Sequence, residues 1–409
     1  MEKKKKLVPK LRFKEFLDAG DWEQRKSVDI ADYSKGNGYS KSDLTENGTP
    51  IILYGRLYTK YQFAIAEVDT FATPKDGSIY SQGNEVIIPA SGETAEDIAR
   101  ASAVEKSGIL LGGDLNILRP FNFINPLFLA LTISNGEPQK ELAKKAQGKS
   151  VVHIHNSDIQ EVTVSFPTRA EQDRIVAVFR SLDNLITLHQ RKVDKLQQVK
   201  KAHLCEMFPE NGKTKPKRRF KCFTDDWEQR KLGELGEIVT GSTPSTTHSE
   251  YYSDDGIPWV TPTDINENLI CDTPRKLSDE GAKVSRVVPA NTILCTCIAS
   301  IGKNALLTVK GSFNQQINSL TPSKENDAYF LLTESELWSN TMKRMAASGT
   351  MQIVNKAEFS ELQIMVPSLP EQQQIGTYFQ QLDNLITLHQ RKVEKLKKLK
   401  ESYLNDMFV

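Results

Sequence analysis

The chain has 409 residues, which is enough for two or three domains that each bury a core of their own. With 38% hydrophobic and 26% charged residues its composition is that of an ordinary globular protein, and a formal net charge of +1 excludes an attraction for nucleic acid that rests on average charge alone. Five cysteines without a CxxC spacing argue against a disulfide framework or a zinc site, and no apolar run approaches the roughly 18 residues that span a bilayer.

The first residues include the basic run Lys3–Lys6, but no apolar stretch follows it, which argues against a secretory signal. An odd number of cysteines fits free thiols in a reducing compartment. We therefore expect a cytoplasmic protein with no membrane segment and no bound metal.

Two blocks of the sequence occur twice, about 200 residues apart. The motif Asp-Trp-Glu-Gln-Arg-Lys stands at 21–26 and again at 226–231, and Arg-Phe-Lys precedes it both times, at 12–14 and 219–221. Solenoid repeats have periods of 20–50 residues, so a period this long indicates two copies of one architecture.

Between the repeated blocks, residues 27–150 and 232–350 do not match well. They carry apolar runs typical of buried strands, followed by segments with helical character. We expect α+β or α/β domains here, with strands at Glu85–Pro89, Gly108–Gly112 and Thr292–Thr296 and helices at Phe128–Ile133 and Ala328–Leu337.

A long helix is predicted at the end of each half. Leu182–Val193 recurs letter for letter as Leu382–Val393, with apolar residues at steps of three and four on both sides. Thr168 with Glu171, and Ser368 with Glu371, have the spacing of capping boxes. At 1.5 Å per residue each helix is about 55–60 Å long.

A narrow apolar stripe of this length needs a partner helix, and the other copy is the obvious one. We expect the two helices to pack as an antiparallel coiled coil about a pseudo-two-fold axis. The expected organisation is a first domain at 1–167, a long helix at 168–208, a linker at 209–221, a second domain at 222–367 and a second long helix at 368–409.

Motifs for catalysis are missing from the sequence. It has no double-proline step for an adenine-methyltransferase loop and no His-Glu-x-x-His. The segments that end in Gly148-Lys149-Ser150 and Gly212-Lys213-Thr214 lack the first glycine of a phosphate loop. His153-Ile-His155 is interpreted as strand residues, Cys295-x-Cys297 as buried core and Asp279-Glu280 with Lys283 as a polar turn rather than a nuclease site.

Polar and aromatic side chains gather in predicted loops of the divergent regions. Asn, Gln and Arg can read base edges in the major groove, and glycine-rich loops allow the backbone to approach closely. Our candidates for base contact are Lys35, Asn37, Lys41, Tyr54, Arg56, Tyr58 and Thr59 in the first half, and Ser242, Thr243, Thr261, Asp264, Gln315 and Gln316 in the second. Tyr54 and Trp259 are equally compatible with a place in the core.

Basic residues concentrate in the linker and on one face of the long helices. They are interpreted either as solvated charge or as phosphate contacts along the DNA. The candidates for phosphate contact are Lys192, Lys195, Lys217, Arg218, Arg219 and Lys392.

The whole chain resembles the specificity subunit of type I restriction–modification systems. The resemblance rests on the Asp-Trp-Glu-Gln-Arg-Lys blocks, the Pro-x-x-x-Glu-Gln helix starts at 167–172 and 367–372, and the repeated Leu-Asp-Asn-Leu-Ile segments. It implies two target recognition domains that each read half of a bipartite DNA site, with helices that set the unread spacer.

The resemblance also implies that the chemistry belongs to partners. Two modification subunits would bring S-adenosylmethionine and methylate adenine, and two restriction subunits would bring ATP- and Mg-dependent translocation and cleavage, so this chain would be a non-catalytic subunit. We expect exposed residues of the helix pair to contact the partners: Glu171, Gln172, Asp183 and Gln190, with their copies Glu371, Gln372, Asp383 and Gln390. For Glu171 and Glu371, solvation and capping of the helix is the simpler interpretation. The alternatives are a nuclease fused to its own recognition domains and a helical scaffold without a DNA role.

Overall fold

The computed structural model describes residues 7–148, 151–210, 212–348 and 352–409, which form two compact units. Unit 1 comprises Met1–His189 and Lys392–Val409, and unit 2 comprises Gln190–Arg391. The two longest helices, α6 (Arg169–Met207) and α11 (Leu369–Asp406), each contribute to both units. The basic start at Lys3–Lys6 and the pair Lys149-Ser150 lie outside the described residues.

Unit 1 contains two five-stranded sheets, ordered β2-β12-β8-β10-β5 and β3-β6-β4-β11-β7, and two-stranded pairs β1-β14 and β13-β9. The strands are β1 (Glu23–Lys26), β2 (Ala31–Lys35), β3 (Leu44–Thr45), β4 (Thr49–Ile52), β5 (Ala64–Ile65), β6 (Phe71–Ala72), β7 (Tyr80–Gln82), β8 (Glu85–Pro89), β9 (Ser91–Gly92), β10 (Ser102–Val104), β11 (Ser107–Leu111), β12 (Leu115–Pro120), β13 (Val152–His153) and β14 (Thr163–Phe166).

Short helices complete unit 1, and α3 packs on β8 and β10 of the first sheet. Pro126 stands in the first turn of α3, where its missing N–H is no loss, and the Asn125 side chain caps the helix by accepting from the amides of Leu127 and Phe128. The helices are α1 (Arg56–Thr59), α2 (Ala95–Ile98), α3 (Pro126–Ile133), α4 (Gly136–Lys145) and α5 (Asn156–Gln160), with 3-10 turns at Lys14–Phe16, Ser27–Asp29 and Lys41–Asp43.

Unit 2 contains a five-stranded sheet ordered β16-β24-β21-β22-β18, a four-stranded sheet ordered β19-β17-β23-β20, and the pair β15-β25. The strands are β15 (Glu228–Lys231), β16 (Gly236–Thr240), β17 (Tyr252–Val260), β18 (Leu269–Ile270), β19 (Lys276–Leu277), β20 (Val287–Val288), β21 (Thr292–Thr296), β22 (Asn304–Leu307), β23 (Gly311–Phe313), β24 (Ile317–Pro322) and β25 (Gln363–Val366). The helices are α7 (Leu232–Leu235), α8 (Asp279–Lys283), α9 (Ala328–Ser348) and α10 (Lys356–Ser360), with a 3-10 turn at Ser249–Tyr251.

The two units have the same strand order and strand directions in their main sheets, although their sequences diverge. In each five-stranded sheet that carries β2 or β16, the first four strands pair antiparallel, and the last pair, β10-β5 or β22-β18, is parallel. The second sheets also match, because β4 pairs parallel with β11 as β17 does with β23. The predicted duplication of one architecture is therefore confirmed at the level of strand order.

The repeated tryptophans mark the same place in each core. In unit 1, Trp22 lies against Phe128 of α3 and against Phe408, which follows the end of α11, with ring centroids 5.8 and 6.3 Å apart. In unit 2, Trp227 lies 5.8 Å from both Phe330 of α9 and Phe208, which follows the end of α6. The Met-Phe pairs that end both repeats are therefore core residues of the unit in which the opposite helix begins.

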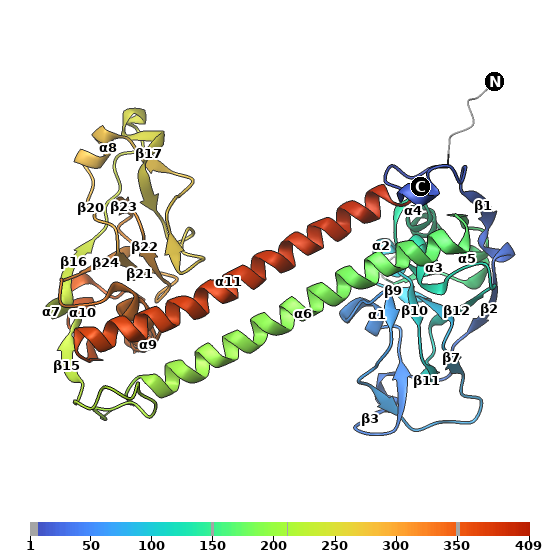
Figure 1. Cartoon of the computed structure of the whole chain (residues 1–409), viewed down its shortest axis with the longest axis horizontal. Coiled ribbons are helices and arrows are strands. Elements are labelled where there is room, and N and C mark those ends of the chain that lie inside the picture. Colours follow the sequence, from blue (N-terminus) through green and yellow to red (C-terminus); the bar gives the residue numbers. More distant parts are fainter. Residues whose placement is uncertain (1–6, 149–150, 211, 349–351) are drawn as a thin grey trace. The chain divides into compact units, whose positions relative to one another are not determined.

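The two long helices run antiparallel inside each unit (Figure 1). In unit 1, Phe179 near the start of α6 contacts Phe408, and Asp183 one turn further along accepts a 2.6 Å hydrogen bond from Lys400 of α11. In unit 2, Phe379 contacts Phe208 and Asp383 pairs with Lys200 at 2.8 Å. The helix pairing predicted from the apolar stripe is confirmed within each unit.

Most of the elements predicted in the divergent regions are present. The strands expected at Glu85–Pro89 and Thr292–Thr296 have those bounds, and the strand expected at Gly108–Gly112 is β11. Both predicted helices are found as α3 and α9, and Cys295 and Cys297 are buried. Among the described helices, none is both long and apolar enough to cross a bilayer.

The predicted capping boxes are wrong. Glu171 and Glu371 are buried, and each carboxylate accepts two hydrogen bonds from an arginine instead of capping its own helix. The partners are Arg12 and Arg219, the first residues of the repeated Arg-Phe-Lys motif. The interpretation of these glutamates as solvated helix ends is also wrong.

Candidate nucleic-acid interface

Three segments of unit 1 meet where β2, β4 and β11 end, and we name this meeting point the unit 1 junction (residues 36–39, 52–56 and 111–115). The amide of Gly36 donates to Leu115 O at 3.0 Å, that of Asn37 to Leu111 O at 3.1 Å, and that of Gly112 to Ile52 O at 2.9 Å. A Cβ on Gly36 would lie 1.9 Å from Gly112 O, so the backbones can approach this closely only at a glycine.

Unit 2 repeats this arrangement where β16, β17 and β23 end, in the unit 2 junction (residues 241–243, 260–264 and 313–317). Gly241 donates to Ile317 O at 3.0 Å, Ser242 to Phe313 O at 2.9 Å, and Asn314 to Val260 O at 2.9 Å. A Cβ on Gly241 would lie 2.0 Å from Asn314 O. The two junctions therefore have matching backbones, and their side chains are what differs.

The unit 1 junction opens into a groove of about 830 Å³. It is lined by Lys41, Tyr54, Arg56 and Thr59, which the sequence predicted as candidates for base contact, and by Gly38 and Gly113. Four predicted residues, one from the 3-10 turn Lys41–Asp43 and three at or just before α1, are thus brought together in one concave surface.

Two carboxylates shape the charge of this groove. Asp69 accepts hydrogen bonds from Lys60 and from Arg56, the latter at 2.8 Å, and these bonds lower its pKa to about 2. Asp43 pairs with Lys75 at 2.5 Å, which lowers its pKa to about 2 as well, and the same lysine lies 5.0 Å from the ring centroid of Tyr39. Both carboxylates stay ionised at neutral pH, so the groove presents mixed charge.

The other candidates of unit 1 are partly committed to contacts within the chain. The Arg56 side chain is 11% exposed, the hydroxyl of Tyr58 donates to Ser91 O, and the Asn37 amide donates to Gly77 O at 2.8 Å. Lys35 is exposed at the end of β2. Lys41, Tyr54, Thr59 and Lys35 are therefore the candidates that remain accessible for contact.

In unit 2 the six candidates all lie at the junction. Thr243 is exposed, and its hydroxyl donates to Gln315 Oε1. Asp264 accepts from the amide and the hydroxyl of Thr261 at 2.8 and 2.6 Å. The remaining two, Ser242 and Gln316, are half-buried and hydrogen-bonded within the junction.

Some basic residues at the junctions were missed by the sequence reasoning. Lys60 and Lys75 line or border the unit 1 groove, and Arg286 donates its backbone amide to Ser242 Oγ at 2.9 Å and a guanidinium hydrogen to Thr240 O at 2.6 Å. Lys75 and Arg286 are distant in sequence from the glycine-rich loops that contain the predicted contacts. The pairing of strands brings these two residues to the junctions, so no local sequence pattern could have predicted that they lie there.

The basic residues of the linker are paired with nearby acids. Lys217 pairs with Glu210, and Arg218 pairs with Glu206 at 2.7 Å. The prediction that Arg219 contacts phosphate is wrong: its side chain is 14% exposed, and its guanidinium donates two hydrogen bonds to the buried Glu371 carboxylate. Lys192, Lys195 and Lys392 are exposed, and no carboxylate in the described part of the chain pairs with them.

The expectation that Gln172 and Gln372 are exposed for partner contact is wrong. Gln172 accepts from the amide of Asn125 at 2.8 Å and donates to Pro167 O at 2.9 Å, and Gln372 makes the same bonds to Asp327 and Pro367. Each of these amides anchors the first turn of a long helix to the unit in which that helix begins. Asp183 and Asp383 form the ion pairs between the helices, and Gln190 and Gln390 are exposed.

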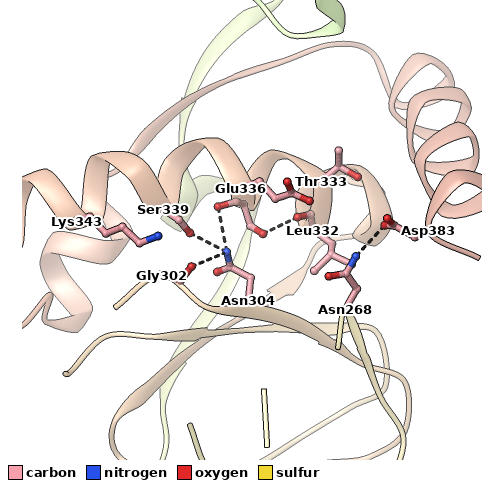
Figure 2. A pocket seen from close by; sticks show the side chains of 10 residues that line it. Asn268, Gly302, Asn304, Leu332, Thr333, Glu336, Ser339, Lys343 and Asp383 are labelled. Carbon is pink, nitrogen blue, oxygen red and sulfur yellow. Dashed lines mark hydrogen bonds between the residues drawn. The ribbon is translucent and has the colours of Figure 1, made fainter. Parts of the chain in front are cut away.

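A cavity of about 270 Å³, smaller than the unit 1 groove, lies in unit 2 beside α9 (Figure 2). Asn304 donates to Ser339 Oγ at 2.7 Å, and Asn268 donates to Asp383 Oδ2 at 2.9 Å, as Figure 2 shows. Lys200 completes this cluster by pairing with Glu336 and Asp383. These polar groups join α9, the sheet and the long helices. Within the described ranges, no three His, Cys, Asp or Glu side chains come together as metal ligands.

Two units of one architecture, each completed by the ends of both long helices, define the class: a duplicated two-domain protein. The sequence matches the family described as type I restriction modification DNA specificity domain twice, over residues 19–198 and 224–398, so the chain belongs to this family. This confirms the resemblance found in the sequence.

Relatives and solved structures agree. The chain is 32% identical to the type I restriction enzyme HindI specificity subunit of Haemophilus influenzae over 46% of its own length and 42% of that subunit. It is 22% identical to the putative type I restriction enzyme MjaX specificity subunit of Methanocaldococcus jannaschii over 94% and 92%. The fold matches the crystal structure of a type I restriction–modification S subunit from M. genitalium with a TM-score of 0.69 at 15% identity, covering 98% of this chain and 99% of that one.

Proposed function

We propose that the two junctions read the two halves of a bipartite DNA target, with the recognition domains at residues 1–167 and 222–367. The observation that carries this proposal is the pair of junctions: their backbones match bond for bond, while their side chains differ. A protein that reads two different short sequences with one architecture needs this combination, because base contacts specify sequence and the frame positions them.

Phosphate contacts would supply most of the affinity. The exposed lysines at the junctions and on the helices, Lys35, Lys41, Lys192, Lys195 and Lys392, have the charge and the exposure for this role. Each phosphate that a lysine neutralises releases counterions, so binding would weaken steeply as salt rises.

The long helices would dock two modification subunits and set the unread spacer. The identical segment 182–193 and its copy expose leucines at the same positions: Leu185 and Leu385 are both 43% exposed, and Leu188 and Leu388 are both 48% exposed. The core does not require these leucines to be apolar, and two equal surfaces suit two copies of one partner. Asp183, Gln190, Asp383 and Gln390 lie in the same segments.

Catalysis would then belong to the partners. The modification subunits would bring S-adenosylmethionine and methylate one adenine in each half-site, and restriction subunits would use ATP and Mg²⁺ to translocate and cleave unmodified DNA. The chain carries no adenine-methyltransferase loop and no complete phosphate loop in its sequence, which supports a non-catalytic role.

The test is a map of adenine methylation in a host that expresses this chain with its modification subunit. The expected result is one motif of two short half-sites with a fixed gap. Replacing residues 27–150 by those of another recognition domain should change one half-site only. Methylation of a single continuous motif, or none from a stable complex, contradicts the proposal.

A further inference from the structure

The unit 2 junction presents one outward-facing amide. Gln315 is exposed at the turn between β23 and β24, whereas its neighbours are committed to the chain. Asn314 is buried and donates from Nδ2 to Gln316 Oε1 at 3.1 Å, and its Oδ1 accepts from the Gln316 amide at 3.0 Å. Of these three amide side chains, Gln315 is the one available to a ligand outside the chain.

The backbone under Gln315 is fixed on both sides. Asn314 donates to Val260 O, and Ile317 accepts from Gly241, so the turn is tied to β17 and to the end of β16. The side chain is also oriented, because the Thr243 hydroxyl donates to its Oε1. A rigid turn and one fixed amide oxygen reduce the conformational entropy that Gln315 would lose on binding.

The matching position in unit 1 is different. Gly112 and Leu115 make the bonds that Asn314 and Ile317 make in unit 2, so Gly113 corresponds to Gln315 and, by the same register, Gly38 corresponds to Thr243. A Cβ built on Gly113 would lie 3.8 Å from the Gly38 nitrogen, and both glycines line the unit 1 groove. Unit 1 therefore has two glycines without side chains at the place where unit 2 carries the hydrogen-bonded side chains of Thr243 and Gln315.

We propose that Gln315 reads an adenine in the half-site of unit 2, with Thr243 as its positioning residue; this inference rests on the proposed function. With Thr243 donating to Oε1, the amide keeps two Nε2–H donors and one acceptor lone pair. An amide nitrogen that donates to N7 and an amide oxygen that accepts from N6–H form the bidentate pair that adenine offers in the major groove. Guanine places two acceptors there, so the oxygen of Gln315 would have no donor to bind.

The adenine read by Gln315 is distinct from the one that is methylated. A methyltransferase takes its target base out of the stack, whereas major-groove reading needs a stacked and paired base. The half-site of unit 2 should therefore contain a second A·T pair at a fixed position, with adenine on the strand that faces Gln315.

The test uses the complete complex of the chain with its modification subunit. Methylation motifs are mapped for the wild type, for Gln315→Ala and for Gln315→Glu, and binding is measured to duplexes with each base at the assigned position. Gln315→Ala should lower the preference for adenine there by roughly 5- to 150-fold and leave the other positions unchanged. Gln315→Glu should shift the preference toward cytosine, whose N4 amino group donates to a carboxylate.

Controls separate reading from structure. Thr243→Val should relax the same position, and Thr243→Ser, which keeps the hydroxyl, should restore it. Gln363→Ala alters an exposed glutamine of β25, away from the junction, and should leave the motif intact. A motif that Gln315→Ala leaves unchanged at every position overturns this inference alone. A wild-type complex without a bipartite motif overturns the proposed function instead.

Discussion

At the scale of single residues, an arginine–glutamate ion pair formed in both units accounts for the repeated arginine of Arg-Phe-Lys. Arg12 and Glu171 form two hydrogen bonds of 2.8 Å, and their side chains are 4% and 1% exposed. Arg219 and Glu371 form the same pair at 2.7 Å. The hydrogen bonds to Glu171 raise the pKa of Arg12, so the guanidinium stays charged. Each pair ties the segment that carries the Arg-Phe-Lys motif to the first turn of a long helix.

Removing one member of this pair should be costly. Arg12→Met leaves the Glu171 carboxylate buried without its partner, and we expect the free energy of unfolding to fall by about 3–5 kcal/mol. Urea denaturation of the full chain measures this change. The exposed pair of Lys140 and Glu137 offers the control, since Lys140→Met should change stability by less than about 1 kcal/mol. Equal effects of the two substitutions would show that the buried pair adds nothing.

Gly36 is a second position where one residue decides the geometry. Gly36→Ala places a methyl group 1.9 Å from Gly112 O, so the strands must separate and the backbone hydrogen bonds of the unit 1 junction are lost. We expect a loss of about 2 kcal/mol or more in unfolding free energy, since buried backbone groups lose their partners. Gly55→Ala is the matched control because nothing lies within 4 Å of its Cβ. Differential scanning calorimetry of both variants would reveal the predicted gap, and identical melting would refute the close approach.

At the scale of elements, each long helix ends in the core of the unit where the other begins. Phe408 packs on Phe128, Trp22 and Phe179 in unit 1, and Phe208 packs on Phe330, Trp227 and Phe379 in unit 2. A recognition unit is therefore completed by residues from the far end of the chain or from the other half of the sequence.

Truncating either phenylalanine should loosen one unit. Phe408→Ala removes a partly buried ring that packs against the unit 1 core, and Phe208→Ala removes a ring that is 3% exposed in unit 2. Removing a buried phenylalanine ring costs about 3–5 kcal/mol, so we expect the loss for Phe208→Ala to be the larger of the two. Hydrogen exchange should speed up in α3 and leave α9 unchanged, whereas Phe208→Ala should do the reverse. The exposed Leu185 provides a control, because Leu185→Ala should alter exchange in neither helix. Faster exchange in both helices after either substitution would mean that the units do not unfold separately.

The sequence predicted the elements better than it predicted the site. Repeats and apolar periodicity depend on local spacing, so both long helices and the strand Thr292–Thr296 could be predicted. The roles of Glu171 and Gln172 could not, because their partners Arg12 and Asn125 lie 159 and 47 residues away in the sequence. The local sequence is compatible with a capping box at Glu171 and with an exposed Gln172. The long-range contacts with Arg12 and Asn125 bury both side chains instead.

At the scale of the whole molecule, duplication serves two opposite requirements. The divergent residues include those at the junctions, as with Gln315 against Gly113, where the proposed reading of two half-sites would require different side chains. The identical residues lie on the long helices, where Leu188 and Leu388 are equally exposed. If two copies of one partner dock there, selection on both surfaces is the same, and their sequences stay identical even though neither leucine is needed by the core.

The number of bound partners should therefore respond to substitution of the exposed leucines. Leu188→Glu keeps a good helix former at an exposed site, so the chain should fold normally, while a charge enters an apolar contact. Native mass spectrometry of the purified complex should give two modification subunits for the wild type and one for Leu188→Glu or Leu388→Glu. The double variant should bind none. Two bound subunits in the double variant would place docking elsewhere on the chain, and one subunit lost from only one of the single variants would mean that the identical segments are not used equivalently.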